Sequence, residues 1–554
     1  MPVDKELVTA LKVSEDAEDE EISASIVALL TSATHDEKPE YTLADIYHLI
    51  SQSGASSLLD PLNLVPLLIS SRDAAAKDIL ALIGQCGSPK EVVMAVQEAV
   101  ERLEESLRAD DADDEDNEAR KDGKKKTLSL PGQLGQLVEL YASAIPKLKL
   151  RRKTASETVR PLLLELDTAV SLASGRASKD EGRLLISNVS ILAAKVIGWA
   201  KDFANVDEVK GCKDILVSLL DATITACARC IHSSVAQRTF EKCFPRLTVR
   251  SAVEAGWEEG DSAMSQAIEA YEALDNRPKT IISAPSTISL ILLAYTDTES
   301  LDPDTLLSSL SPILVASIQS NAVLDESLSI LIKTLHRRQL QPRSDLSADI
   351  IGPLSTVIPT LSSAHPDPLV RHQAFRVLSM LLSLSPSQLR LQILTELTTK
   401  SEFPQMRVAS VGLVKEAVLE ALSNPSSTNV FSSPMLLRVF GPILFRPNPP
   451  DLFSEAASLD ALQESQESSR LVECLALYYI LLQRDVKNLT GIRDKDVISS
   501  VEKSLLLPLR NALGRWMEDQ EIANNHMHEI MPLVSLKMSL ERVDAARAAL
   551  MSTS

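Results

Sequence analysis

The residues best suited to chemistry are two cysteines three positions apart, Cys227 and Cys230, in the run Cys-Ala-Arg-Cys-Ile-His that ends at His232. A Cys-x-x-Cys pair can bind zinc or cycle between a dithiol and a disulfide. Zinc would need a second close pair of ligands, which His232 and Cys243 supply only at an awkward spacing. The surrounding run is apolar and helical in pattern, and free cysteine is common as a small core residue. We therefore interpret the pair as buried core, with a redox-active dithiol as the alternative and zinc as a third.

The rest of the sequence carries no catalytic signature. It has no phosphate-binding glycine loop, no H-E-x-x-H helix and no G-x-S-x-G turn. His526 and His528 lie two positions apart, so on a helix their side chains would point about 200° from each other and would not readily share a metal. We interpret them as surface histidines. These observations predict that the protein is not an enzyme and needs no cofactor or metal.

Two arginines, Arg371 and Arg407, occupy equivalent positions in an internal repeat. A shift of 36 residues places Arg371 on Arg407 and Leu378 on Val414, within two apolar helical faces. Another helical pattern, 388–398, lies between the two faces, which makes one helix pair per step, as in helical-hairpin repeats. We expect the two arginines to bond the backbone or an aspartate of a neighbouring repeat. The alternative is that they contact a protein partner.

The helices that would position these residues are marked by start signals spread along the chain. In Ser88-Pro89-Lys90-Glu91 a serine precedes a proline at the first helical position and a glutamate at the third. Proline fits this position because its missing N–H would have no partner there. Further predicted starts are Asp60-Pro61, Asp302-Pro303, Ser311-Pro312, Asp367-Pro368 and Ser385-Pro386.

The composition favours helices stacked on helices. Hydrophobic residues make up 45% of the 554 residues, which is enough for a large core, yet only 17 are glycine and 3% are aromatic. Sheets favour aromatic residues and need turn glycines, whereas long stacked helices need neither. We predict an all-α fold, an irregular HEAT/ARM-like α-solenoid of antiparallel helix pairs.

The main break in the helical pattern is an acidic segment. Seven of the nine residues from Asp110 to Glu118 are acidic, and like charges at this density do not pack together. We predict N-terminal helical repeats at 1–103, a disordered acidic insertion at 104–127 and a continuous solenoid at 128–554. Proline-rich or polar loops are predicted near 423–434 and 446–451, because proline stops helices.

The net charge and the apolar runs limit the cellular environments and the partners that this chain can have. A net charge of −20 repels phosphate backbones and argues against nucleic-acid binding. The basic cluster from Lys147 to Lys153 is interpreted as a solvated helix end, with an acidic partner as the alternative. The apolar stretch from Leu184 to Ala200 is interrupted by polar residues and predicts a buried helix, so no membrane contact is expected. Six scattered cysteines fit a reducing compartment. We expect the cytoplasm, with the nucleus as a second location.

Two segments resemble a known family, the glomulin and YAP-binding protein family. They are His365–Leu422 (HPDPLVRHQAFRVLSMLLSLSPSQLRLQILTELTTKSEFPQMRVASVGLVKEAVLEAL) and Gly87–Glu105 (GSPKEVVMAVQEAVERLEE). The second half of the longer segment is most similar to fungal members. The resemblance implies a HEAT-like solenoid without catalysis, and neither segment transfers a partner-contacting residue.

The resemblance also implies two kinds of protein partner. Fungal members of the family bind an AP-1-like transcription factor in the peroxide response, and we expect this chain to be a non-enzymatic scaffold of that kind. Animal glomulin binds the RING subunit of cullin-RING ubiquitin ligases and blocks recruitment of the ubiquitin-conjugating enzyme, which is the alternative. By analogy we expect the partner surface from about Gln339 onward. A thiol oxidoreductase using Cys227 and Cys230 remains as a remote third hypothesis.

Overall fold

The computed structural model describes residues 5–14, 17–36, 38–112, 127–150, 152–248, 250–275, 285–341, 345–424, 426, 428–454, 462, 465–518 and 527–553. Throughout these residues the regular structure is helical, apart from an isolated bridge between Ser71 and Thr127. Neighbouring helices pack on one another along the chain. The prediction of an all-α fold of stacked helices is confirmed.

The chain divides into two compact units. Unit 1 comprises 1–238, 246–300 and 325–327, and unit 2 comprises 239–245, 301–324 and 328–554. Helix α6 (Pro89–Ala112) packs against α7 (Leu130–Ala144) and α8 (Ala155–Ser174) across the acidic segment, so the helices before and after that segment belong to the same unit. Helix α6 also contains residues 104–112, which were predicted as part of the insertion. Residues 113–126 lie outside the described residues.

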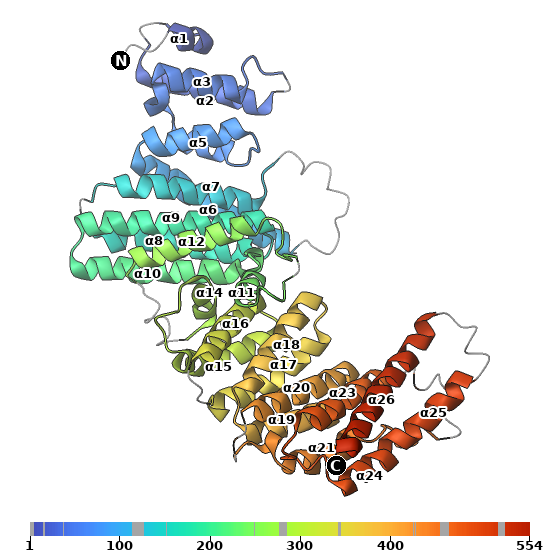
Figure 1. Cartoon of the computed structure of the whole chain (residues 1–554). Helices are drawn as coiled ribbons and strands as arrows, with labels where there is room; N and C mark the ends of the chain where they lie inside the picture. Colours follow the sequence, from blue (N-terminus) through green and yellow to red (C-terminus); the bar gives the residue numbers. More distant parts are fainter. Residues whose placement is uncertain are drawn as a thin grey trace. The chain divides into compact units, whose positions relative to one another are not determined.

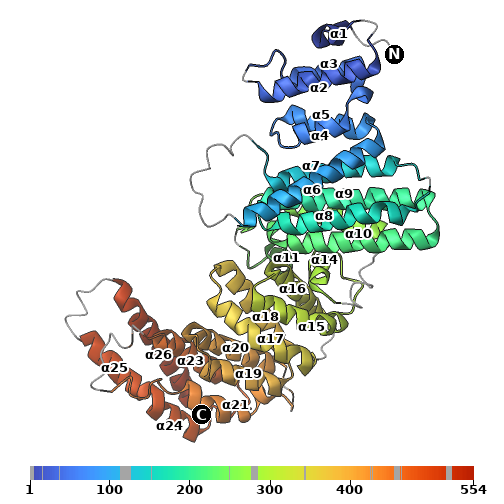
Figure 2. The same cartoon turned by 180° about the vertical axis from the view of Figure 1, so that it is seen from behind.

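The helices of unit 1 follow one another as successive packed neighbours, with α7, α8, α9 and α10 side by side in both views (Figures 1 and 2). Their bounds, beyond those of α6, α7 and α8, are α1 (Lys5–Leu11), α2 (Asp19–His35), α3 (Leu43–Ser53), η1 (Ala55–Leu58), α4 (Pro61–Leu68), α5 (Ala74–Cys86), η3 (Ile145–Lys147), α9 (Lys179–Phe203), α10 (Val206–Ala226), η4 (Ala228–Cys230), α12 (Trp257–Ala273) and α14 (Thr287–Tyr295). Helix α11 (Val235–Cys243) contributes residues to both units.

Unit 2 contains the repeat found in the sequence. Its elements are α15 (Pro303–Ser320), α16 (Leu324–Leu340), which also gives three residues to unit 1, α17 (Ala348–Ala364), α18 (Pro368–Ser383), α19 (Ser387–Thr399), α20 (Pro404–Ser423), η5 (Val430–Ser432), α21 (Met435–Leu444), α23 (Glu467–Arg484), α24 (Lys495–Val501), the π-helical turn η6 (Glu502–Leu506), α25 (Leu507–Glu518) and α26 (Met527–Thr553). Helix α17 packs on α18, α19 on α20, and α20 on α23.

Most of the predicted helix starts have the expected local chemistry. The carboxylates of Asp60, Asp302 and Asp367 accept hydrogen bonds from backbone N–H groups of the first turns of α4, α15 and α18, with proline at the first helical position. A side-chain acceptor satisfies N–H groups that have no partner within the helix. These residues therefore begin helices for a purely local reason.

Two predicted starts were wrong. Pro312 lies inside α15, because buried leucines run along this helix on both sides of the proline, and their burial outweighs the lost backbone bond. Helix α19 begins at Ser387 with Pro386 as its N-cap. The Ser385 hydroxyl instead donates to the carbonyl of Leu381, at 2.7 Å, and so closes the preceding helix.

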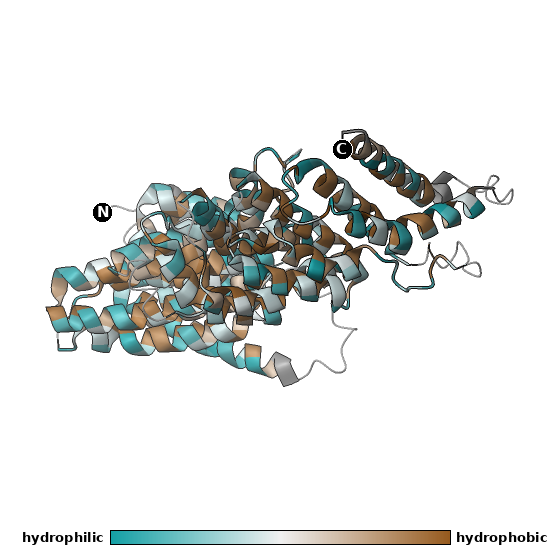
Figure 3. Ribbon diagram, turned by 60° about the horizontal axis from the view of Figure 1, so that its bottom comes forward, coloured by the Kyte–Doolittle hydropathy of each residue, from teal (hydrophilic) through white to brown (hydrophobic). Residues whose placement is uncertain are grey.

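The two apolar faces predicted around the repeat are buried. Leu378 of α18 and Val414 of α20, which the repeat superposes, are both fully buried in unit 2. Figure 3 shows the alternation of hydrophobic and hydrophilic residues along single helices that this packing requires. Neither helix could bury its face alone, so the stack is the unit of stability.

Helix α9 alone among the described helices is long and apolar enough to cross a membrane, judged by length and composition. Its apolar window is 61% buried by protein, since α7, α10 and α12 pack against it. The core helices of soluble proteins meet the same length and composition test. This placement agrees with the interpretation of Leu184 to Ala200 as a buried helix.

Candidate functional site

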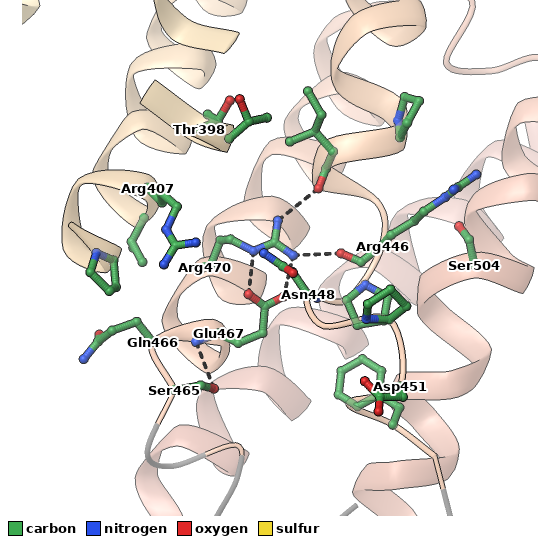
Figure 4. Close-up of a pocket in the computed structure, with 18 of the residues that line it drawn as sticks. Thr398, Arg407, Arg446, Asn448, Asp451, Ser465, Gln466, Glu467, Arg470 and Ser504 are labelled. Atoms are coloured by element: carbon green, nitrogen blue, oxygen red, sulfur yellow. Dashed lines mark hydrogen bonds and ion pairs between the residues drawn. The ribbon is translucent and has the colours of Figure 1, made fainter. Parts of the chain in front are cut away.

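A hollow of about 830 Å³ lies in unit 2, where the end of α19 and the start of α20 face the end of α21 and the start of α23. We call it the α20–α23 pocket. Its size is within the range of clefts that hold ligands or peptide side chains. Residues with hydrogen-bonding side chains around it include Thr398, Arg407, Arg446, Asn448, Glu467 and Arg470 (Figure 4).

The proline-rich connection between α21 and α23 forms one wall of this pocket. Pro447, Pro450 and Phe453 line it, together with Pro404 and Pro508 from the helices opposite. Prolines cannot donate to a helix or a strand, so this connection has no regular secondary structure. Their fixed backbone angles also make the wall stiff, which lowers the entropy lost when a ligand binds.

A buried ion pair holds this wall in place. The Arg470 Nε donates to Glu467 Oε2 at 2.7 Å, and a second Arg470 nitrogen contacts Glu467 Oε1. The Arg470 guanidinium also donates to the carbonyls of Ile443 (3.2 Å) and Arg446 (2.7 Å), and the Asn448 N–H donates to Glu467 Oε1 at 2.9 Å. Figure 4 shows these contacts converging at the base of the connection. Two side chains of α23 thus bond both carbonyl and N–H groups at the start of the irregular connection.

Burial also determines the electrostatics of this pair. Arg470 and Glu467 expose only 7% and 6% of their surfaces. Burial by itself lowers the pKa of Arg470, but the hydrogen bonds to Glu467 outweigh it and raise that pKa above its usual value. Arg470 therefore stays charged and depends on Glu467 for compensation.

Arginine occupies the same position in three helices of unit 2. Arg371, Arg407 and Arg470 are each the fourth residue of their helices, α18, α20 and α23. Arg371 Nη1 donates to the carbonyls of His365 (2.6 Å) and Pro366 (2.9 Å), just before its own helix. Arg470 bonds the connection before its helix in the same way. Two of the three thus bond the backbone that enters their own helix, whereas the sequence had suggested bonds of Arg371 to a neighbouring repeat.

Arg407 departs from this pattern. Within the described part of the chain, its guanidinium makes no hydrogen bond or ion pair, and it is half-buried in the lining of the α20–α23 pocket. Figure 4 shows its side chain pointing from α20 into the pocket, on the side of Arg470 and Asn448. The repeat predicted that Arg371 and Arg407 are equivalent in position, and the structure separates them by environment.

A smaller hollow of about 450 Å³ in unit 2 provides a contrast. The end of α16, the α18–α19 junction and the end of α20 line it, and its arginines are Arg338 and Arg390. Arg338 pairs with Asp304 at 2.8 Å, and Arg390 pairs with Glu420 at 2.8 Å. The cations of this second hollow are therefore compensated within the chain.

The two cysteines singled out by the sequence lie in the core of unit 1. Cys227 caps the end of α10 and Cys230 ends the turn η4. The sequence predicted one continuous helix through both cysteines, and this was wrong. Both are free thiols and buried. Burial raises the pKa of Cys227 to about 12 and also raises that of Cys230. Thiols in this state are protonated near neutral pH, and a protonated thiol is a poor nucleophile.

The other candidate ligands do not converge either. Among the described residues, no three His, Cys, Asp or Glu side chains are placed to hold a metal ion. His526 and the side chain of His528 lie outside the described residues. In the basic cluster, Lys147 Nζ donates to the carbonyls of Gly84 (3.0 Å) and Gln85 (2.8 Å), so it caps the end of α5.

Comparison with known proteins places most of unit 2 in a family. Residues 289–542 match the model of an uncharacterised protein family described as YAP/Alf4/glomulin. These residues belong to the YAP/Alf4/glomulin family. The match confirms the resemblance found in His365–Leu422, whereas the second resembling segment, Gly87–Glu105, lies outside the matched residues. Among curated proteins, no match was found.

The YAP/Alf4/glomulin region contains both hollows and the three arginines at helix position four. The pocket itself was not anticipated from the sequence. The Glu467 and Arg470 spacing of three residues on a helix could have signalled an ion pair. Nothing local to the sequence shows that this pair reaches the carbonyls of Ile443 and Arg446, because those groups lie in the preceding connection.

Proposed function

We propose that this chain is a non-enzymatic protein-binding scaffold that regulates an oxidative-stress response by binding an AP-1-like transcription factor. The observation that carries the proposal is the coincidence of the YAP/Alf4/glomulin region with the α20–α23 pocket and its uncompensated arginine. The family description names YAP, which favours a transcription-factor partner. Stacked helices also provide a long surface suited to holding another protein.

The state of the thiols supports placing the redox chemistry in the partner. Cys227 and Cys230 are buried and their pKa values are raised, so neither is poised to react with peroxide. Because this Cys-x-x-Cys pair is not poised for oxidation, we place the peroxide-dependent change in the partner, which the scaffold would recognise in its oxidised or modified form. Binding and release, with no covalent step on this chain, then constitute its mechanism.

Affinity purification tests the proposal directly. The tagged full-length chain is isolated from cells before and after peroxide treatment, and the bound proteins are identified by mass spectrometry. We expect a leucine-zipper transcription factor whose recovery changes with peroxide. A cullin with its RING subunit would favour ubiquitin-ligase inhibition and overturn the transcription-factor assignment. An enzymatic activity of the purified chain on a small molecule, with no bound protein recovered, would overturn the scaffold function itself.

We place this complex in the cytoplasm, with the nucleus as the second location, in keeping with the scattered free cysteines and the acidic composition. Fluorescence microscopy of the tagged chain before and after peroxide tests the placement. An extracellular or membrane-bound signal would contradict it.

A further inference from the structure

We propose that the α20–α23 pocket binds an anionic side chain of an extended partner segment, either a phosphorylated residue or a carboxylate, and that Arg407 is the residue that contacts it. This inference rests on the proposed scaffold function and names the chemistry of the segment that the scaffold takes. Three observations carry it: the freedom of Arg407, the local charge of the pocket and the stiffness of its wall.

The first observation is that the Arg407 side chain has no hydrogen-bond or ion-pair partner among the described residues. The guanidinium groups of Arg371 and Arg470, at the same helix position, donate hydrogen bonds to backbone carbonyls at 2.6–3.2 Å. Arg407 keeps all its side-chain donors unused within the described residues and directs them into a hollow (Figure 4). A half-buried guanidinium without a partner loses part of its hydration and gains nothing in return. An incoming anion would supply the missing compensation.

The charge around Arg407 is the second observation. The charged residues that line the pocket are Arg407, Arg446 and Arg470 against Asp451 and Glu467. Because Glu467 is committed to Arg470, only the exposed Asp451 remains to oppose Arg407 and Arg446. The pocket is thus locally positive in a chain of net charge −20, so this sign is specific to the site.

Two helix starts add to this positive potential. The first turns of α20 and α23 both line the pocket, and the N-cap residues of these helices, Phe403 and Gln466, make no side-chain cap bond. In α23 the Ser465 hydroxyl accepts from the Glu467 N–H at 3.3 Å. These helices are 20 and 18 residues long, so each presents the positive end of a full helix dipole. The positive ends of two helix dipoles beside a guanidinium favour the binding of an anion such as a phosphate or a carboxylate.

The walls of the pocket are the third observation, and they indicate an extended peptide. Pro404, Pro447, Pro450 and Pro508 give the pocket apolar, rigid sides next to its cationic centre. A flexible chain segment loses less free energy to ordering when the receptor is already rigid. The pocket volume of about 830 Å³ holds a few residues, with one anionic side chain at Arg407.

The retention of peptides by the immobilised chain tests the proposal. The immobilised full-length chain is exposed to degenerate peptide pools that differ only in a central phosphoserine, glutamate, serine or lysine. We expect the phosphoserine or glutamate pool to be retained more than the serine pool, and the lysine pool least. Comparing the first two pools decides whether phosphate or carboxylate is the natural group.

Arg407→Gln is the decisive variant. A charge-assisted hydrogen bond lost at one site reduces affinity by about 10- to 100-fold, so retention of the anionic pools should fall to that of the serine pool. Arg407→Lys, which keeps the charge without the fork of donors, should retain part of the preference. Arg438→Gln is the matched control, because Arg438 is exposed on α21 and lies outside the pocket lining.

Loss of folding is not expected to affect this test, because the Arg407 side chain has no intramolecular hydrogen bond to lose within the described part of the chain. The melting temperature of Arg407→Gln should therefore match that of the parent chain. An anionic preference that persists in Arg407→Gln, or that Arg438→Gln abolishes equally, would overturn the proposal. So would equal retention of all four pools. The scaffold function is judged separately: capture of a transcription factor by both the parent and Arg407→Gln, with no anionic preference, would reject only the inference about the pocket.

Discussion

Replacing Glu467 by glutamine should loosen the wall of the α20–α23 pocket. Glutamine keeps the size of the side chain and an oxygen that can accept from the Asn448 N–H, which Glu467 now binds at 2.9 Å. It removes the negative charge that compensates Arg470. The Arg470 guanidinium, only 7% exposed, would then be a buried cation with no counterion.

The expected cost follows from this burial. Removing one partner of a buried ion pair costs about 3–5 kcal/mol, because the remaining charge is stranded in a medium that solvates it poorly. At about 1.36 kcal/mol for each factor of ten, the connection should open about 10²- to 10⁴-fold more often. The backbone N–H groups of Leu452 and Ser454 donate to carbonyls within this segment, and that of Asn448 donates to residue 467, so all three report on that opening.

Hydrogen exchange followed by mass spectrometry, on peptides that cover 443–454, measures the effect. The matched control is Glu473→Gln on the same helix, where Glu473 pairs with Lys415 at 2.9 Å but both side chains are about one-third exposed. A pair of that kind contributes about 1 kcal/mol or less. Equal exchange rates in the Glu467→Gln and Glu473→Gln chains would refute the argument from burial.

Three further predictions concern unit 1. Burial, with Asp325 alongside, raises the pKa of Glu326 to about 7 from 4.5. The folded chain therefore holds this proton more tightly than the unfolded chain, so the stabilising contribution of Glu326 should be complete below pH 4.5 and be lost, by about 3 kcal/mol, as the pH rises from 4.5 to 7. Melting temperatures should show that Glu326→Gln removes this part of the pH dependence, and an unchanged slope would contradict the assignment. Gly260→Ala should destabilise unit 1 severely, because a Cβ there would lie 2.0 Å from the Ile231 carbonyl oxygen, whereas Gly198→Ala, with open space around it, should stabilise α9 by up to about 1 kcal/mol. Urea unfolding of both chains checks the pair, and a well-tolerated Gly260→Ala would refute the close contact. Timed alkylation with mass spectrometry should modify the exposed Cys86 well before the buried Cys227 and Cys230, and the reverse order would revive the oxidoreductase hypothesis.

Much of the architecture could be predicted because it depends on interactions within about one helical turn. An aspartate before a proline starts a helix wherever it occurs, so Asp60, Asp302 and Asp367 marked α4, α15 and α18 correctly. Apolar residues at helical spacing marked the buried faces of α18 and α20. The match over 289–542 confirmed the family that His365–Leu422 had indicated.

The prediction failed where distant groups compete with local signals. Pro312 lies within α15 because the buried leucines of that helix are held by neighbouring helices. Helix α6 runs on to Ala112, into the segment that the acidic residues had marked as an insertion from residue 104. Cys227 and Cys230 showed a redox spacing in the sequence, and the packing of unit 1 buried both thiols.

By itself the sequence determined that this protein is a stack of helices, because capping and periodicity act over a few residues, and it indicated the likeness of residues 289–542 to the YAP/Alf4/glomulin family. Only the tertiary structure decided which arginine is free. Arg371, Arg407 and Arg470 have the same helix position, and their roles differ according to the carbonyls that the preceding connection brings within reach. A guanidinium becomes structural or available according to groups that the chain brings together only when it folds.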